Sequence, residues 1–288
     1  MKLRLSQGYL FIAPAVILII IMAVYPTFRV VYLSVMDYSR VSKEMVFVGM
    51  DNYTKIIADA NFQKAIIQTL KFSLFSTAGH IVFGLILALI MNAGLNRRFV
   101  NTSRALILLP WALSPIVVAI LAQLWSYPLI SPIAKILESL GYAVEFNPLG
   151  KTGSALWTLS IINIWQFTPF FMLMMLAGLQ TIDPSLDDAA MVDGASTIQK
   201  IRYITIPHLR NLILTLLLFD LVTTAAYFDL IWVTTQGGPV RSTEVLATYM
   251  YRIGFLTLDW NRAATVGVIL LVLCICIAAL VVFQLRED

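Results

Sequence analysis

Charged side chains are scarce in this sequence. Only 12% of its 288 residues are Asp, Glu, Lys or Arg, and 59% are hydrophobic, whereas soluble domains carry about 25% charged residues. This composition excludes a soluble globular protein. Apolar runs of roughly 20 residues, long enough to cross a bilayer as helices, occur at residues 9–35, 66–92, 105–126, 155–179, 211–234 and 263–285. The sequence therefore predicts an all-α, polytopic membrane protein with six transmembrane helices, in a single domain over residues 1–288.

Groups suited to catalysis or metal binding are equally rare. The two cysteines, Cys274 and Cys276, are two positions apart in the last run, where helical side chains point to different sides, so we expect no disulfide between them. The two histidines are far apart, and no Cys, His and carboxylate cluster has metal-ligand spacing. Residues 150–152 (GKT) resemble the end of a phosphate-binding loop, but Glu145 stands where that loop requires glycine. We therefore expect no enzyme, no cofactor or metal bound by this chain, and no nucleotide hydrolysis by it.

The net charge of +4 is explained by topology. With the N-terminus inside, the shorter inner connections are richer in Lys and Arg than the outer ones, as the positive-inside rule requires. This bias predicts that both termini are cytoplasmic, and it accounts for the charge without a nucleic-acid partner. The connection between the fourth and fifth runs then lies in the cytoplasm.

Asp220 is the one acid deep within an apolar run, and His80 is the one deep histidine. A lone carboxylate in a membrane costs about 2.5–3.5 kcal/mol and should face the bundle interior or water. The alternative function is a stand-alone secondary transporter of a small polar solute. Two such groups are too few for an effective proton relay, which disfavours this alternative. The sequence leaves open whether the two residues serve transport or hold helices together by hydrogen bonds.

The cytoplasmic connection carries its own helix signals. Asp183 and Pro184 are typical of an N-cap and a first helical position. Gly194 can adopt the left-handed conformation that ends a helix. Residues 196–199 (STIQ) form a capping box that starts a second short helix. The pattern predicts a helix, a bend and a second helix over about residues 184–204, before Pro207 opens the fifth span.

This segment has two interpretations. An amphipathic hairpin lying on lipid would carry basic residues along its polar face. Its first half instead carries four carboxylates, and small alanines flank the bend, where another surface could approach the backbone closely. These features favour docking to a protein partner.

The same segment resembles the signature loop of importer-type ABC transporter permeases, whose pattern is E-A-A-x-x-x-G followed by an apolar tail and L-P. The positions that carry the resemblance are Asp188, Ala189, Ala190, Asp193, Gly194, Ala195 and Pro207. Asp188 stands where the family usually has glutamate, which affects the geometry of one contact. In that family the cytoplasmic helix fits a cleft on the ATPase. The resemblance therefore implies that residues 188–190 and 193–195 couple this chain to ATP hydrolysis.

Other segments resemble the carbohydrate-uptake branch, of the maltose and glycerol-phosphate type. They are FVGMDNYTKII from Phe47, LLPWALSPIVVA from Leu108, NIWQFTPFFM from Asn163 and FDLIWVTTQGGP from Phe228. The resemblance implies a permease subunit of an ATP-driven, binding-protein-dependent importer of a sugar or sugar-like solute. It implies a location in a bacterial or archaeal cytoplasmic membrane. It also implies three kinds of partner: a second homologous permease, two cytoplasmic ATPase subunits that bind ATP and Mg, and an extracytoplasmic solute-binding protein. The solute-binding protein would dock on the outer loops, including residues 236–239.

In that family the sugar site lies between spans, on segments that match LPWALSP, NIWQFTPFF and TTAAYFD here. The resemblance implies a substrate pathway lined by Trp111, Asn163, Gln166, Phe167, Phe170, Thr223, Thr224 and Tyr227. Aromatic faces can stack on the C–H surface of a sugar ring, and amides and hydroxyls can bond its OH groups. For any single one of these residues, helix packing is the alternative role.

Overall fold

The computed structural model describes residues 2–39, 44–93, 96–127, 131–141 and 147–286. The chain divides into two compact units. Unit 1 consists of Met1–Gln63 and Tyr249–Val272, and unit 2 consists of Lys64–Thr248 and Leu273–Asp288. The expectation of one functional domain stays a prediction.

Unit 1 begins with the first predicted span, which is a continuous helical run. Its elements are α1 (Lys2–Ile19), the π-helical turn η1 (Ile20–Val24), α2 (Tyr25–Ser34), β1 (Met36–Ser39), β2 (Glu44–Phe47) and α3 (Asp51–Ala58). The sequence predicted an all-α fold and did not predict the antiparallel β1–β2 hairpin. The side-chain amides of Asn52 and Asn261 both donate to the carbonyl of Met36, and they also bond the last carbonyls of α2. These bonds satisfy acceptors that a helix end leaves free.

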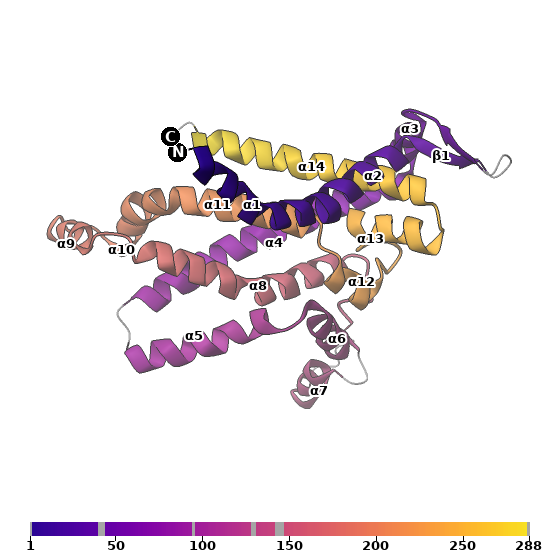
Figure 1. Cartoon of the computed structure of the whole chain (residues 1–288). Helices are drawn as coiled ribbons and strands as arrows, with labels where there is room; N and C mark the ends of the chain where they lie inside the picture. The colour runs from indigo at the N-terminus through magenta and orange to yellow at the C-terminus, as the bar shows by residue number, and fades with distance from the viewer. Residues whose placement is uncertain (1, 40–43, 94–95, 128–130, 142–146, 287–288) are drawn as a thin grey trace. The chain divides into compact units, whose positions relative to one another are not determined.

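Unit 2 contains most of the remaining helices. They are α4 (Ala60–Asn92), α5 (Arg97–Ala112), α6 (Pro115–Ser126), α7 (Pro132–Ser139), α8 (Ala155–Leu179), α9 (Pro184–Val192), α10 (Thr197–Lys200), the π-helical turn η2 (Ile201–Thr205), α11 (Ile206–Ala225) and α12 (Asp229–Thr235). α13 (Leu246–Tyr251) and α14 (Trp260–Arg286) run from one unit into the other, with η3 (Arg252–Leu256) between them. α9 and α10 lie at one end of unit 2, and α6, α7 and α12 lie at the other (Figure 1).

α8 is the central helix of unit 2 and the most buried of its apolar helices. It packs against α5, α6, α11 and α12, and Gly84 lets α4 approach it closely, because a Cβ there would lie 2.7 Å from Cβ of Phe171. Phe171, Met172 and Met175 of α8 centre one apolar core with Leu209 of α11. The bounds of α8, Ala155–Leu179, confirm the prediction of a span at residues 155–179.

The third predicted span, residues 105–126, is sharply broken into two helices. α5 and α6 meet at an angle of 92°. Leu113 and Ser114 are extended, with ψ of 140° and 139°, because Pro115 disfavours the helical conformation in the residue before it. Within the described residues, five helices are long and apolar enough to cross a membrane, or six if the bent pair counts as one span.

The fifth predicted span, residues 211–234, also needs correction at both ends. The helix does not begin at Pro207, because α10, η2 and α11 continue one another from Thr197. It breaks after Ala225 and resumes as α12 at Asp229. The second helix of the cytoplasmic segment is therefore the first part of the span itself.

Candidate functional site

The first helix of the cytoplasmic segment begins as predicted. Asp183 is the N-cap of α9, and its carboxylate accepts a hydrogen bond of 2.9 Å from the backbone N–H of Ser185. This bond favours the charged form of the carboxylate and lowers the pKa of Asp183. Pro184 occupies the first turn, where its missing N–H costs nothing.

The bend at Gly194 is a complete helix-ending motif. Gly194 has a φ of +72°, its N–H donates to the carbonyl of Met191, and the N–H of Ala195 donates to the carbonyl of Ala190. These are the two bonds of the Schellman motif, which needs a left-handed residue at this position. The sequence prediction of a glycine-terminated helix is confirmed.

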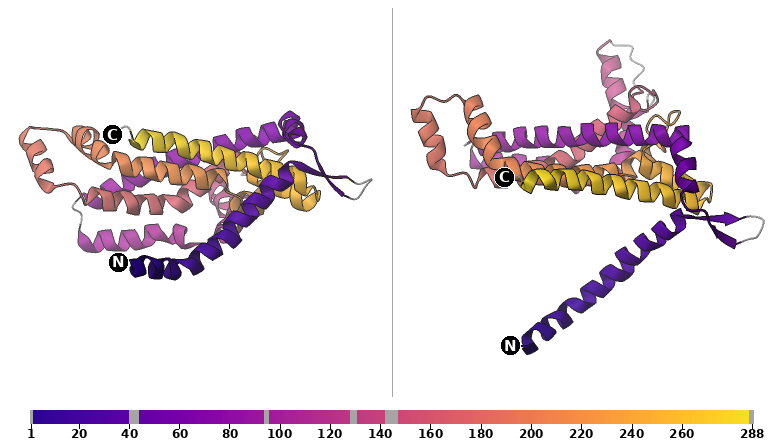
Figure 2. Two further views of the ribbon diagram at one scale, coloured as in Figure 1. Left: turned by 45° about the horizontal axis from the view of Figure 1, so that its top comes forward. Right: turned by 90° about the horizontal axis from the view of Figure 1, so that it is seen from above.

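The second helix starts with the predicted capping box. The hydroxyl of Ser196 accepts from the backbone N–H of Gln199, and the Gln199 side chain accepts from the backbone N–H of Ser196 at 2.7 Å. Both ends of the bend are thus determined by bonds within a few residues. In Figure 2 the α9–α10 segment stands clear of the ends of the long helices of unit 2.

The residues predicted to contact an ATPase are mostly accessible. Asp188, Ala189, Asp193 and Gly194 are exposed, Ala195 is half-buried, and Ala190 is buried against the segment itself.

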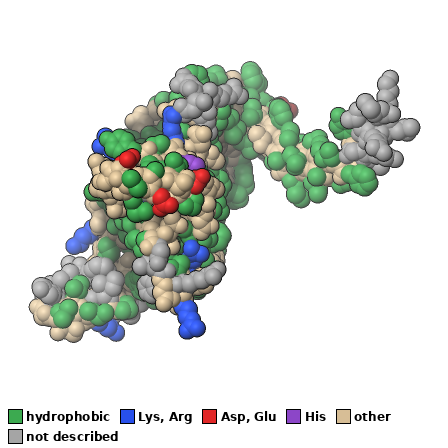
Figure 3. Space-filling model, turned by 90° about the vertical axis from the view of Figure 1, so that its left-hand side faces the viewer, with side chains coloured by type: hydrophobic (Ala, Val, Ile, Leu, Met, Phe, Trp, Pro, Cys, Tyr) green, Lys and Arg blue, Asp and Glu red, His purple; other side chains and the backbone are tan. Residues whose placement is uncertain are grey.

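Large apolar side chains surround these residues at the surface, with Val192 88% exposed and Ile198 77% exposed. Figure 3 looks onto this end and shows acidic side chains grouped among hydrophobic ones. Exposed apolar side chains of this size beside a defined acidic group are typical of a protein-docking surface.

A groove of about 660 Å³ lies between this segment and the ends of the long helices. It is lined by Pro184 and Asp188 of α9, Asn92 of α4, Leu179 of α8 and Lys200 of α10. The segment is joined to the spans by its covalent continuation into α11.

Seven of the eight residues predicted for the substrate pathway line one cleft of about 300 Å³ in unit 2. They are Trp111 from α5, Asn163, Phe167 and Phe170 from α8, Thr223 and Thr224 from α11, and Tyr227 from the break before α12. The rings of Trp111 and Phe170 stack with centroids 5.7 Å apart, and those of Phe167 and Tyr227 meet edge to face at 5.7 Å. The cleft thus has aromatic walls and a few polar groups.

One polar atom of the cleft lining is buried without a partner. Within the described part of the chain, Oδ1 of Asn163 has no hydrogen-bond partner, whereas the hydroxyl of Tyr227 interacts with the Asn163 side chain. Burying an unpaired polar group costs free energy. An arrangement of this kind is typical of a site that a polar ligand completes.

Gln166 lies away from the cleft. Its side chain is 1% exposed, and its Nε2 donates a 3.1 Å hydrogen bond to the carbonyl of Leu113. Leu113 is at the sharp bend between α5 and α6, where the backbone leaves the helical ladder. Gln166 therefore supports the broken span, and its predicted role in the substrate pathway has no support from its position.

The structure adds Phe171, Phe219 and Asp220 to the cleft. The sequence analysis did not place these in the pathway. Phe219 and Asp220 precede Thr223 and Thr224 by one helical turn, so helical spacing was the signal that could have identified them.

Asp220 and His80 form a buried pair beside this cleft. Nδ1 of His80 lies 2.8 Å from Oδ2 of Asp220, and Nε2 of His80 lies 3.2 Å from the carbonyl oxygen of Asn163. Thr224 donates to the other oxygen of the Asp220 carboxylate at 3.1 Å. The imidazole stacks on the ring of Phe171 at 5.0 Å. Three helices, α4, α8 and α11, meet through this pair.

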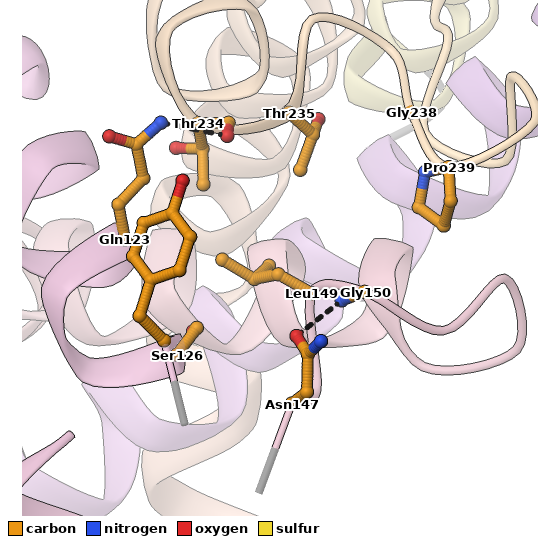
Figure 4. Close-up of a pocket in the computed structure, with 10 residues that line it drawn as sticks. Gln123, Ser126, Asn147, Leu149, Gly150, Thr234, Thr235, Gly238 and Pro239 are labelled. Carbon is orange, nitrogen blue, oxygen red and sulfur yellow. Dashed lines mark hydrogen bonds between the residues drawn. The ribbon is translucent and has the colours of Figure 1, made fainter. Parts of the chain in front are cut away.

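A second hollow, of about 320 Å³, lies at the opposite end of unit 2 from α9. Gln123, Asn147 and Thr234 line it together with Gly238 and Pro239, from the loop predicted to receive a binding protein (Figure 4). Nε2 of Gln123 donates to the carbonyls of Val233 and Thr234, which attaches α6 to α12. These bonds hold the loop near the end of α6.

Long apolar helices, a capped helix–bend–helix and an aromatic cleft with a few polar groups between spans define a membrane transport permease. The chain belongs to the family described as binding-protein-dependent transport system inner membrane component, whose sequence profile matches residues 80–286. It is therefore a multi-pass inner-membrane permease subunit of an ABC importer. Such a permease works with a solute-binding protein and a separate ATPase, and it is not itself an enzyme.

Curated relatives match over nearly the whole chain. The trehalose/maltose transport system permease protein MalF of Thermococcus litoralis is 32% identical and covers 98% of this chain and 95% of its own length. The sulfoquinovosyl glycerol transport system permease protein SmoG of Agrobacterium fabrum is 34% identical over 94% of this chain and 87% of its own length. A chain from the crystal structure of a bacterial ABC transporter that imports the acidic polysaccharide alginate superposes with a TM-score of 0.88, at 23% identity, over 99% of this chain and 96% of that one. The last match supports the fold.

Proposed function

We propose that this chain forms half of the translocation pathway of an ATP-driven importer for a sugar or sugar-like solute. The other half is a second, homologous permease, and two cytoplasmic ATPase subunits bind ATP and Mg. Both termini lie in the cytoplasm of a bacterium or archaeon. Residues 188–190 and 193–195 couple the spans to the ATPase, and the aromatic cleft receives the solute.

The observation that carries this proposal is the composition of the cleft lining. Aromatic rings of Trp111, Phe167 and Phe170 offer flat apolar faces. Asn163 and Tyr227 offer polar side chains, and Oδ1 of Asn163 has no partner among the described residues. A carbohydrate presents the complementary surface, with C–H groups on the ring faces and hydroxyls at the edge. The sugar names carried by relatives such as the trehalose/maltose permease support the same class of solute.

The coupling proposal is supported by the cytoplasmic segment. Its bend is rigid, because local bonds hold both sides, and its tip presents apolar and acidic side chains to solvent. The helix that follows the bend runs without interruption into α11, which carries Thr223 and Thr224 to the cleft. A partner that moves α9 would therefore act on the spans directly.

The pocket is tested with the assembled importer in proteoliposomes. The double variant Asn163→Ala/Tyr227→Ala should weaken the apparent affinity for the transported sugar about tenfold or more, because each lost hydrogen bond contributes about 1 kcal/mol. The control, Asn211→Ala/Tyr25→Ala, removes the same side chains at exposed positions and should leave affinity unchanged. Unaltered affinity and rate in the first variant would show that the pocket lies elsewhere.

The driving force is tested separately. Liposomes that contain the complete importer and internal ATP should accumulate sugar, and liposomes that contain this chain alone should not. Uptake by the chain alone under an ion gradient would instead support a stand-alone secondary transporter.

A further inference from the structure

We propose that Asp220 is a specificity-determining residue of the cleft, which admits uncharged polyhydroxy solutes and rejects anionic ones. This inference rests on the proposed function, since it names the chemical class of solute that the same cleft accepts. It also assigns a transport role to a residue pair that the sequence analysis left open between function and packing.

The Asp220 carboxylate has unused hydrogen-bonding capacity at the cleft. Asp220 is only 4% exposed, yet it is part of the cleft lining. His80 occupies one of its oxygens and Thr224 occupies the other. An ionised carboxylate offers about four acceptor positions, so about two remain for hydroxyl donors of a solute. Charge-assisted bonds of this kind are stronger than bonds between neutral groups.

The partners of His80 determine the charge of the pair. Its Nε2 faces the carbonyl oxygen of Asn163, which can only accept a hydrogen bond, so Nε2 carries a proton. Its Nδ1 faces a carboxylate oxygen of Asp220, and one further proton lies between these two atoms. The pair as a whole is therefore neutral. With the proton on His80, an imidazolium lies behind the carboxylate, and the parallel ring of Phe171 covers its face.

The orientation of the pair makes binding of an anionic solute in the cleft unfavourable. His80 is not part of the cleft lining and is 1% exposed, so the negative end of the pair faces the cleft. None of the described residues that line the cleft is a Lys, Arg or His. A carboxylate, phosphate or sulfonate group of a solute would lose its hydration shell on entering the cleft. It would meet no cationic side chain there and would lie beside the Asp220 carboxylate. Burying an unpaired charge is strongly unfavourable.

The experiment compares matched solutes on the assembled importer in nanodiscs, without binding protein, so that the permease alone selects. The probes are maltose, trehalose and glucosylglycerol, each beside the analogue in which one CH₂OH is oxidised to a carboxylate. Equilibrium binding of each probe is measured by calorimetry. We expect at least one neutral probe to bind, and its carboxylate analogue to bind at least 100-fold more weakly.

Asp220→Asn preserves the shape of the side chain and removes its charge. It should weaken binding of the neutral probe about tenfold and reduce the discrimination against the analogue to less than tenfold. Asp220→Glu keeps the charge and should retain discrimination. Asp51→Asn makes the same change at an exposed position outside the cleft lining and should alter neither value. If the pair has a purely structural role, Asp220→Asn should weaken binding of the neutral probe and of its carboxylate analogue equally. The ratio of the two affinities would then be unchanged.

The outcomes separate the two proposals. If neutral probes bind and Asp220→Asn retains the full discrimination, this inference is overturned while the proposed function stands. Tight binding of a carboxylate analogue by the wild type overturns it as well, even if the Asp220→Asn complex does not assemble. If the wild type binds neither kind of probe, the assignment of a sugar to this cleft has failed, and the inference fails with it.

Discussion

The bend at Gly194 allows a test that separates folding from coupling. Gly194 has a φ of +72°, and nothing lies within 4 Å of the position that a Cβ would occupy. A substitution therefore causes no clash within the chain and costs only the left-handed backbone conformation, roughly 1–2 kcal/mol for an L-residue. This cost falls on a surface segment, so the membrane helices should remain folded.

The effect on coupling should be much larger. Any side chain at Gly194 projects from an exposed bend between Asp193 and Ala195, where we expect the ATPase to approach the backbone. Gly194→Asp should leave the complex assembled, or nearly so, and abolish substrate-stimulated ATP hydrolysis and uptake. Gly194→Asn, which tolerates the left-handed conformation better, should relieve strain and still impair coupling, because its side chain has the same size.

Gly141 provides a matched control. It follows α7, has a φ of +84°, and likewise has nothing within 4 Å of a Cβ position. Gly141→Asp therefore introduces the same charge and similar strain outside the cytoplasmic segment. Assembly is measured by co-purification with the ATPase, and hydrolysis and uptake are measured in proteoliposomes. Normal uptake by Gly194→Asp, or an equal loss in Gly141→Asp, would refute the reasoning.

Two further predictions concern the stability of unit 2. Gln166→Leu should lower the free energy of unfolding by about 1–3 kcal/mol, because the half-buried carbonyl of Leu113 loses its donor at the bend; an unchanged melting temperature of the purified complex would contradict this. Gly84→Ala should cost about 1–3 kcal/mol by overpacking, because its Cβ would lie 2.7 Å from Cβ of Phe171. Gly153→Ala, which meets nothing within 4 Å, should have little effect in the same melting assay, and equal shifts in the two glycine variants would argue against close packing as the cause.

The sequence by itself determined the features that depend on neighbouring residues. A run of apolar residues must form a helix in a bilayer, because the backbone has no other way to satisfy its polar groups there. The end signals at Asp183, Gly194 and Ser196 likewise act over a few residues, so the cap, the bend and the capping box were all predicted and all confirmed.

Only the tertiary structure decided which distant residues meet. His80 and Asp220 belong to different helices, and nothing local to either one indicates that they pair. From the sequence, the amide of Gln166 is as suitable for binding a sugar as the amide of Asn163. In the structure it instead donates to the carbonyl of Leu113. The sharp bend of 92° after Leu113 has a local cause in Pro115, but the packing of α6 against α12 and α8 involves residues far away in the sequence. Local propensity selects conformations within a few residues, whereas the cleft and its charge arise from long-range packing of helices, which the sequence pattern of a single segment does not contain.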